Sequence, residues 1–98
     1  MSPITDAQVE RVRRLVAAIP PGRVATYGDI ASAAELSSPR IVGWIMRTDS
    51  SDLPWHRVIT ASGRPAAHLA TRQLELLRAE GVLADDGKVN LAEARHTF

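Results

Sequence analysis

The 98-residue sequence contains no cysteine. This absence excludes disulfide bonds, thiolate nucleophiles and cysteine-rich zinc sites together. The sequence also lacks an apolar run of membrane-spanning length and, at Met1, a charged segment followed by an apolar one. We therefore expect a cytoplasmic protein with no membrane partner, no bound metal and no cofactor.

Lysine is almost as scarce as cysteine, since eleven of the twelve basic residues are arginine. Arginine suits bidentate contacts with phosphates and bases better than lysine does. The net charge is only +1, but residues 37–72 carry five arginines against Asp49 and Asp52. A basic middle segment is compatible with nucleic-acid binding, although the charge count alone does not establish it.

Length and composition predict one folded domain over residues 1–98. Hydrophobic residues make up 45% of the chain and charged residues 23%, which are ordinary values for a globular protein and argue against disorder. A chain of this length is large enough for a single modest core and too small for two domains.

The first helix is predicted to start at a capping box, Thr5-Asp6-Ala7-Gln8. Its apolar stripe follows at helical spacing, and Pro20-Pro21-Gly22 ends it. The members of the stripe are Val9, Val12, Val16 and Ile19. Residues 23–25 are then expected to form a short extended link.

Two short helices follow and predict a helix-turn-helix. Thr26 can cap the first of them, with Asp29 at its third position. Ser38 can cap the second, with Pro39 at the first helical position, where a missing N–H costs nothing. Its inward stripe would be Val42, Ile45 and Met46. Gly43 would permit close packing, and Arg40 would stand exposed near the N-terminal end, where a recognition helix meets DNA.

The second half of the chain is expected to contain one strand, one helix and a hairpin. Residues 55–60 read from turn to strand, and residues 66–80 form an Ala- and Leu-rich helix ended by Gly81. Asp85-Asp86-Gly87 predicts a hairpin turn that resembles the wing of a winged helix. Residues 92–98 carry no readable pattern.

The densest cluster of chemically distinctive residues is Leu53-Pro54-Trp55-His56-Arg57-Val58-Ile59. A turn that contains Pro-Trp can simply place an indole in the core, and His-Arg can be solvated, so pattern alone leaves a packing role open. The cluster acquires a functional meaning from the rest of the chain.

Four motifs in register resemble the C-terminal DNA-binding domain of O6-alkylguanine-DNA alkyltransferases. They are Ile19-Pro20-Pro21-Gly22-Arg23-Val24-Ala25-Thr26-Tyr27-Gly28-Asp29-Ile30-Ala31, then Ser38-Pro39-Arg40-Ile41-Val42-Gly43, then Pro54-Trp55-His56-Arg57-Val58-Ile59, and Glu80-Gly81-Val82. The enzymes have cysteine at the position of Trp55. The chain therefore resembles the alkyltransferase-like branch, whose members bind alkylated guanine without repairing it.

The resemblance implies a mostly α fold with short β elements, similar to a winged helix-turn-helix. It also implies a non-enzymatic monomer that binds double-stranded DNA with O6-alkylguanine, flips the damaged base and flags it for nucleotide excision repair proteins. The missing thiol independently supports the absence of enzymatic activity, because direct alkyl transfer needs a soft nucleophile and an indole is not nucleophilic. An indole can instead stack on a flipped base.

The resemblance also assigns roles to individual residues. Arg40 matches the arginine that fills the gap left by the flipped nucleotide, and Tyr27 matches the tyrosine that crowds the target phosphate. His56 and Glu80 match a proton relay and are expected to survive as a hydrogen-bonded structural pair. The remaining DNA contacts implied are Thr26, Ser38, Pro39 and Gly43, and the lesion pocket is assigned to Tyr27, Trp55, Val58 and Arg64.

Two departures from the family pattern leave the alkyl-size preference open. The loop between Arg47 and Pro54 is shorter than in the enzymes. The link from Gly63 to Arg72 is also short relative to relatives whose arginine there approaches the damaged base. Arg64 or His68 would have to substitute for that arginine, and Arg57 is expected to brace the loop rather than to contact DNA.

Other functions remain as alternatives at this level. A winged-helix transcriptional regulator would read an operator, usually as a dimer, and no dimer seam is visible in the sequence. A hydrolase would use His56 and Glu80 to activate water. Residual alkyl transfer is excluded in practice by the absent nucleophile.

Overall fold

The computed structural model describes residues 4–98, in which helices predominate and the strands are short. This agrees with the fold class that the sequence predicts. The molecule is elongated, 39 × 26 × 22 Å. In chain order the elements are α1 (Asp6–Ala17), β1 (Ala25–Thr26), α2 (Tyr27–Ala33), α3 (Pro39–Thr48), the 3-10 helix η1 (Trp55–Arg57), β2 (Val58–Ile59), the 3-10 helix η2 (Ala67–Leu69), α4 (Ala70–Ala79), β3 (Ala84–Asp85), β4 (Lys88–Val89) and α5 (Leu91–Ala94).

The predicted capping box at the start of α1 is confirmed. The Thr5 hydroxyl accepts from the Gln8 backbone N–H at 3.1 Å, and the Gln8 side chain accepts from the Thr5 N–H at 2.9 Å. Val12 and Val16 of the predicted stripe are fully buried. Local capping and apolar spacing thus account for this helix.

The helix-turn-helix is confirmed as α2 and α3. Thr26 and Asp29 form a complete capping box at the start of α2, and Ser38 caps α3 by accepting from the Arg40 N–H at 3.1 Å. Glu35 adopts a φ of 58° in the intervening turn. Val42 and Ile45 are buried, so the opposite face of α3 is left to solvent.

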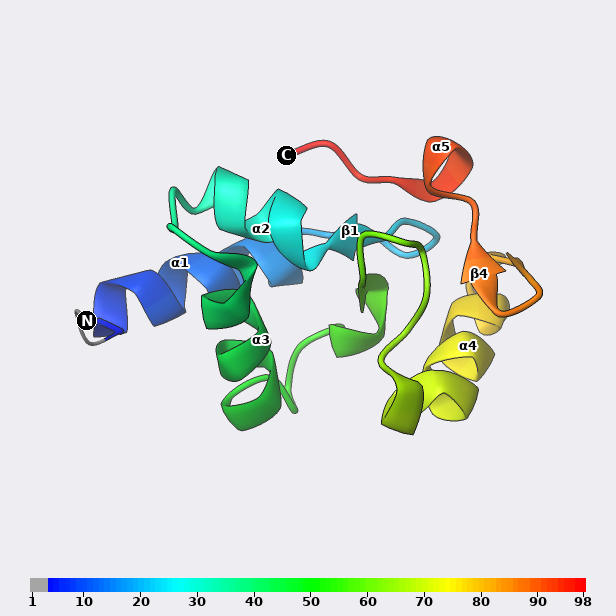
Figure 1. The fold of residues 1–98 in the computed structure, drawn as a ribbon, viewed down its shortest axis with the longest axis horizontal. Helices are drawn as coiled ribbons and strands as arrows, with labels where there is room; N and C mark the ends of the chain where they lie inside the picture. Colours follow the sequence, from blue (N-terminus) through cyan, green and yellow to red (C-terminus); the bar gives the residue numbers. More distant parts are fainter. Residues whose placement is uncertain (1–3) are drawn as a thin grey trace.

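The buried side chains form two hydrophobic clusters. In Figure 1, α1, α2 and α3 lie toward one end of the molecule, α4, β4 and α5 lie toward the other, and β1 lies between them. β1 pairs with β2 in the register Ala25 to Val58 and Thr26 to Ile59. Because successive side chains of a strand point to opposite faces, Val58 packs with the cluster of α1, α2 and α3, whereas Ile59 packs with α4 and the C-terminal elements. The segment after Trp55 is therefore held from both sides.

Several boundaries in the second half differ from the sequence-based predictions. Residues 67–69 form η2, so α4 begins at Ala70 rather than at residue 66. Trp55 starts a 3-10 turn before the strand. The predicted hairpin is present as β3 and β4, with Asp86 at φ 54° and Gly87 at φ 74°. Positive φ at both turn residues is what a two-residue hairpin loop requires.

The C-terminal residues, which carry no readable pattern, are ordered by tertiary contacts. Arg95 forms a β-bridge with Val24, and the His96 N–H donates to the Val24 carbonyl at 2.7 Å. The Arg95 guanidinium also pairs with the Asp29 carboxylate at 2.9 Å. In the part of the chain that the structure describes, no helix has the length and apolar character needed to span a bilayer.

Candidate nucleic-acid interface

An open groove with a volume of about 770 Å³ lies between α3 and the segment of η2 and α4. Its walls come from α2, α3, the loop that follows α3, η1, β2, η2 and α4. The lining residues are Tyr27, Pro39, Arg40, Gly43, Met46, Arg47, Thr48, Ser50, Ser51, Trp55, Val58, Ala66, His68, Leu69 and Gln73. The groove thus brings together six residues that the sequence assigns to DNA or to the lesion: Tyr27, Pro39, Arg40, Gly43, Trp55 and Val58.

The α3 side of the groove is exposed and basic. Arg40 and Arg47 are both exposed, and neither forms an ion pair within residues 4–98. Both positive charges are therefore available to an anionic ligand such as a phosphate.

Gly43 does not have the packing role expected from the sequence. A Cβ at this position would meet nothing within 4 Å, so no neighbouring element requires a glycine there. Gly43 instead lines the groove, where the missing side chain leaves the helix backbone open to the close approach of a ligand.

Thr26 and Ser38 act through the helices that they cap. Thr26 is 2% exposed, and its hydroxyl accepts from the Asp29 N–H at 3.0 Å, which keeps it away from the surface. The Thr26 hydroxyl is thus occupied by the helix cap and is not exposed for a DNA contact, and the expected contact of this residue stays a prediction. Its effect is to place Tyr27 at the first position of α2.

Tyr27 is half-buried at the edge of the groove. Burial raises the pKa of its phenol, and the positive charge of Arg47 acts in the opposite direction. The phenol therefore stays protonated at neutral pH and can donate a hydrogen bond to a phosphate oxygen.

Trp55 and Val58 form an apolar wall of the groove. Trp55 opens η1, and its indole packs edge-on against the His56 ring, with the ring centroids 6.1 Å apart and the ring planes at 89°. Because Trp55 is only partly buried, one part of the indole still faces the groove. Such a surface can stack on a planar base.

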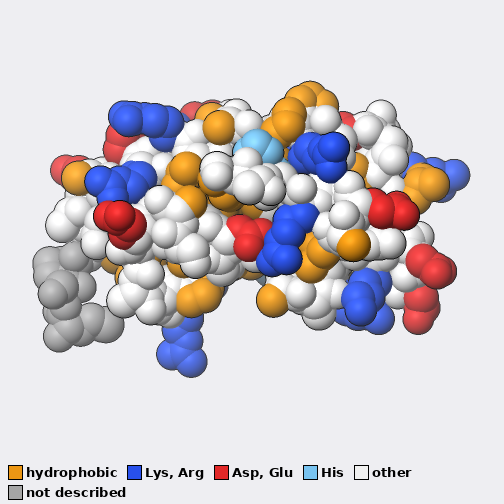
Figure 2. All heavy atoms as spheres, turned by 90° about the horizontal axis from the view of Figure 1, so that it is seen from above, with side chains coloured by type: hydrophobic (Ala, Val, Ile, Leu, Met, Phe, Trp, Pro, Cys, Tyr) orange, Lys and Arg blue, Asp and Glu red, His pale blue; other side chains and the backbone are white. Residues whose placement is uncertain are grey.

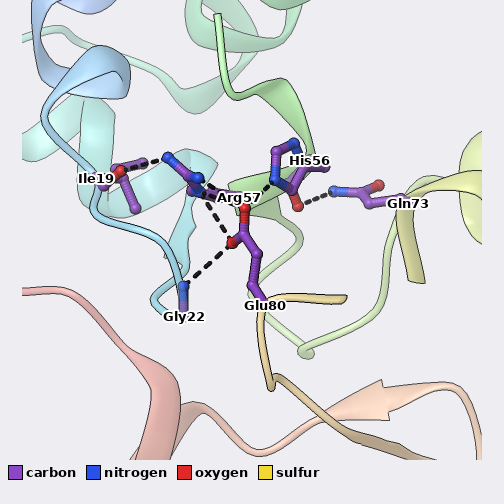
Figure 3. A network of polar contacts seen from close by, with 6 residues as sticks. All are labelled: Ile19, Gly22, His56, Arg57, Gln73 and Glu80. Carbon is purple, nitrogen blue, oxygen red and sulfur yellow. Dashed lines mark hydrogen bonds and ion pairs between the residues drawn. The ribbon is translucent and has the colours of Figure 1, made fainter. Parts of the chain in front are cut away.

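A polar network behind this wall fixes the turn that carries Trp55 (Figure 3). The His56 Nε2 atom lies 2.8 Å from Glu80 Oε2, and Arg57 Nη2 donates to the same oxygen at 2.6 Å. Arg57 Nη1 donates to the Ile19 carbonyl at 2.9 Å, and Glu80 Oε1 accepts from the Gly22 N–H at 3.1 Å. The network joins η1, the end of α4 and the loop after α1.

Glu80 is strongly stabilised as a carboxylate. Hydrogen bonds from Arg57 lower the pKa of Glu80 to about 2; burial opposes this effect, and His56 and the Gly22 N–H reinforce it. Both His56 and Glu80 lie outside the groove lining. The predicted pairing of His56 with Glu80 is present, and Arg57 braces the loop as expected.

Gln73 is a supporting residue that the sequence analysis missed. It is 2% exposed, and its side-chain amide donates to the carbonyls of His56 at 3.0 Å and Val58 at 2.7 Å. Its spacing of four residues from both Leu69 and Leu77 puts a polar side chain on the buried face of α4. That position was the available signal, because a buried amide must find partners.

The loop after α3 is tied to α1 through Arg13. The Arg13 guanidinium donates to the Asp49 carbonyl at 2.8 Å and to the Asp52 carboxylate at 2.5 Å. The hydrogen bond from Arg13 lowers the pKa of Asp52. The Ser50 hydroxyl, inside the same loop, donates to the Met46 carbonyl. These contacts shape the groove wall at Ser50 and Ser51.

Arg64 is the predicted pocket residue that the structure places elsewhere. Its guanidinium donates to the Asp86 carbonyl at 3.0 Å in the β3–β4 hairpin and is not part of the groove lining. The physical reason is that the Thr60–Gly63 turn directs Arg64 toward the hairpin, with the Gly63 carbonyl accepting from the Val89 N–H. His68, the alternative named from the sequence, does line the groove.

Acidic and basic side chains are mixed on another face of the molecule. Figure 2 shows acidic and basic side chains interspersed on the face seen from above, next to hydrophobic areas. Within residues 4–98, no three histidine or carboxylate side chains come together in a way that could hold a metal ion. Arg40 and Arg47 are the basic residues that line the groove.

Comparison with known proteins identifies similar chains. Residues 7–82 match the model of the family "6-O-methylguanine DNA methyltransferase, DNA binding domain". A DNA base-flipping protein of Escherichia coli (strain K12) is 39% identical over 101 residues, which cover 95% of this chain and 77% of that protein. Alkyltransferase-like protein 1 of Schizosaccharomyces pombe is 38% identical over 84 residues, which cover 79% of this chain and 78% of that protein.

Solved structures give the same picture. The crystal structure of S. pombe Atl1 in complex with damaged DNA containing O6-carboxymethylguanine has a TM-score of 0.83 and 32% identity, and the match covers 96% of this chain and 98% of that chain. The structure of Mycobacterium tuberculosis OGT in complex with DNA has a TM-score of 0.67 and 33% identity, with 78% of this chain and 50% of that chain covered.

Proposed function

The chain belongs to the family of 6-O-methylguanine DNA methyltransferase DNA-binding domains, and from that premise we propose that it binds double-stranded DNA containing O6-alkylguanine and flips the damaged base into the groove without transferring the alkyl group. The observation that carries the proposal is the position of Trp55. An indole stands at the groove wall in a chain that has no cysteine to accept an alkyl group.

Base flipping assigns complementary tasks to Tyr27 and Arg40. Extruding a nucleotide costs a few kcal/mol of lost stacking and pairing. The exposed Arg40 guanidinium offsets part of this cost by entering the vacated space and hydrogen-bonding the orphaned base. Tyr27, at the groove edge, crowds and hydrogen-bonds the phosphate of the target nucleotide and favours its rotated conformation.

The flipped base then stacks against Trp55 and Val58. The indole offers a flat apolar surface to the purine and to the alkyl group on O6. Gly43 and Pro39 leave the α3 backbone accessible to the DNA strand on either side of the extruded nucleotide. The lesion is thereby sequestered and left chemically unchanged.

A hydrolytic role for His56 and Glu80 is not favoured. The Glu80 carboxylate is occupied by Arg57, His56 and the Gly22 N–H, and its low pKa leaves it a weak base. Since both residues stand behind the groove wall, activated water would form away from the stacked base. We therefore propose a binding protein and not an enzyme.

A protein that binds a lesion without removing it requires a partner that completes the repair. We propose that the complex is recognised by nucleotide excision repair proteins, and that the protein acts as a cytoplasmic monomer. The basis for a monomer is that the groove and the exposed face of α3, which carry the proposed contacts, belong to a single chain.

The decisive experiment compares two duplexes that differ only in one O6-methyl group on guanine. Fluorescence anisotropy with each labelled duplex gives the two affinities, and we expect the damaged duplex to bind more tightly. Equal affinities would refute lesion recognition and would revive the transcriptional-regulator alternative. A parallel incubation with duplex labelled in the alkyl group checks the second half of the proposal, since label that leaves the DNA would identify an enzyme.

A further inference from the structure

A tryptophan is exposed on the helix that forms one side of the groove. Trp44 of α3 is 46% exposed, and it is one of three large hydrophobic side chains exposed in the part of the chain that the structure describes, with Leu83 and Phe98. Trp44 does not line the groove and is not one of the buried or partly buried residues that make up the two core clusters. The fold therefore leaves nearly half of this residue open to solvent.

Trp44 lies close in sequence to the two exposed arginines of α3, Arg40 and Arg47. It follows Arg40 by four residues and precedes Arg47 by three, so the three side chains are neighbours on the outward face of α3. Pro39, Gly43 and Met46 of the same helix turn toward the groove. Trp44 stands on the other flank of the arginines, outside the groove but beside it.

An apolar ring next to unpaired guanidinium groups is a combination that fits the DNA minor groove. Arginines neutralise phosphates, and apolar side chains of minor-groove proteins insert between base steps and bend the duplex. A protein partner with a purely apolar surface would have to desolvate both arginines without pairing them, which is costly. Charge complementarity thus selects the duplex as the occupant of this surface.

We propose that Trp44 is a second wedge, which enters the minor groove beside the flipped nucleotide and stabilises the bent duplex. This inference rests on the proposed function. The rise of an α-helix is 1.5 Å per residue, so Trp44 lies ~6 Å along the axis from Arg40. Bases on one strand are ~3.4 Å apart. With α3 lying along the groove, Trp44 therefore meets the step about two base pairs from the lesion.

The test places 2-aminopurine two base pairs from O6-methylguanine, on either side in separate duplexes, because its fluorescence rises when stacking is lost. We expect a rise on one side with the natural protein and with Trp44→Phe, and none with Trp44→Ala. A probe six base pairs further away should not respond. Trp44→Ala should also bind the damaged duplex about tenfold more weakly, the usual effect of losing one aromatic–base contact.

Phe98→Ala is the matched control, since Phe98, the last residue of the sequence, is an aromatic residue of similar exposure, 42%, that does not line the groove. It should leave both affinity and probe fluorescence unchanged. Unchanged affinity and fluorescence for Trp44→Ala would overturn the wedge. The same titrations with undamaged duplex report lesion preference in the natural protein, so a failure of the proposed function is seen separately from a failure of Trp44.

Discussion

Arg57 donates hydrogen bonds to Glu80 from two nitrogen atoms of its guanidinium: Nε lies 3.0 Å from Oε1, and Nη2 lies 2.6 Å from Oε2. The residues are far apart in sequence, and both side chains are largely buried, with 14% and 16% exposed. A bidentate arginine–carboxylate pair also fixes orientation. The pair therefore holds the turn that presents Trp55 to the groove.

Removing the charge of Glu80 should destabilise the protein. Glu80→Gln leaves the largely buried Arg57 without a counter-charge, and we expect a loss of about 2 to 3 kcal/mol in the free energy of unfolding. Urea denaturation followed by circular dichroism measures this change. Glu75→Gln is the control in α4, the helix that Glu80 follows directly, since Glu75 makes an exposed pair with Arg72 at 3.9 Å, and such pairs contribute little. A similar loss for both variants would contradict the role assigned to Glu80.

Stability should also fall at acidic pH because of Glu80. Its pKa is lowered from 4.5 to about 2 by folding, so the unfolded chain takes up the proton first as pH falls. The stabilisation is complete above pH 4.5 and is lost as pH drops toward 2, with a total of up to ~3 kcal/mol. Unfolding free energies measured across this range should decline more steeply for the natural protein than for Glu80→Gln. Parallel curves would show that other carboxylates govern the decline.

Replacement of Arg40 should weaken lesion binding without affecting the fold. Arg40 is exposed and unpaired among the described residues, so Arg40→Ala loses contacts only when the duplex is bound. We expect a decrease in affinity for the damaged duplex of about tenfold or more. Arg78→Ala, an exposed arginine of α4 outside the groove, controls for the loss of one positive charge. Equal effects of the two variants would reduce Arg40 to a general electrostatic contribution.

Trp55 should determine discrimination between damaged and undamaged DNA. In Trp55→Ala the flipped base loses its stacking surface, and we expect the affinity difference between the two duplexes to shrink about tenfold. Trp55→Cys supplies a thiol, but a groove that binds without reacting has not had to keep the geometry for attack on the alkyl carbon, so we expect no alkyl transfer. Mass spectrometry of the protein after incubation with damaged duplex detects a transferred alkyl group. A stoichiometric mass increase would mean that the groove retains attack geometry.

Replacement of Gly43 by alanine should change stability and DNA affinity in opposite directions. Alanine has the higher helix propensity, and the added Cβ meets open space in the free protein. Gly43→Ala should therefore stabilise the fold by about 0.5 to 1 kcal/mol. The same methyl group would obstruct close approach of the DNA strand, so affinity for duplex should fall. A variant that is both more stable and equally tight in DNA binding would remove Gly43 from the interface.

Helices and turns could be predicted from the sequence where they depend on interactions between residues that are close in the chain. The capping boxes at Thr5 and Thr26, the proline after Ser38 and the Asp86-Gly87 turn depend on residues within a few positions, and each predicted its element. Boundaries were less accurate where no cap exists: η2 replaces the predicted start of the long helix because Leu69 provides no side-chain cap for α4. The C-terminal residues were unreadable because their order comes from Val24 and Asp29.

The sequence by itself determined that no thiol is available and that Tyr27, Arg40 and Trp55 stand in motifs of one family, because composition and motif order need no coordinates. Tertiary structure alone decided which of these side chains share a groove. It placed Arg64 against the hairpin, brought Gln73 beneath the Trp55 turn and left Trp44 uncovered beside Arg40. These outcomes depend on how distant segments pack, and packing partners are set by the whole core rather than by the spacing of neighbouring residues.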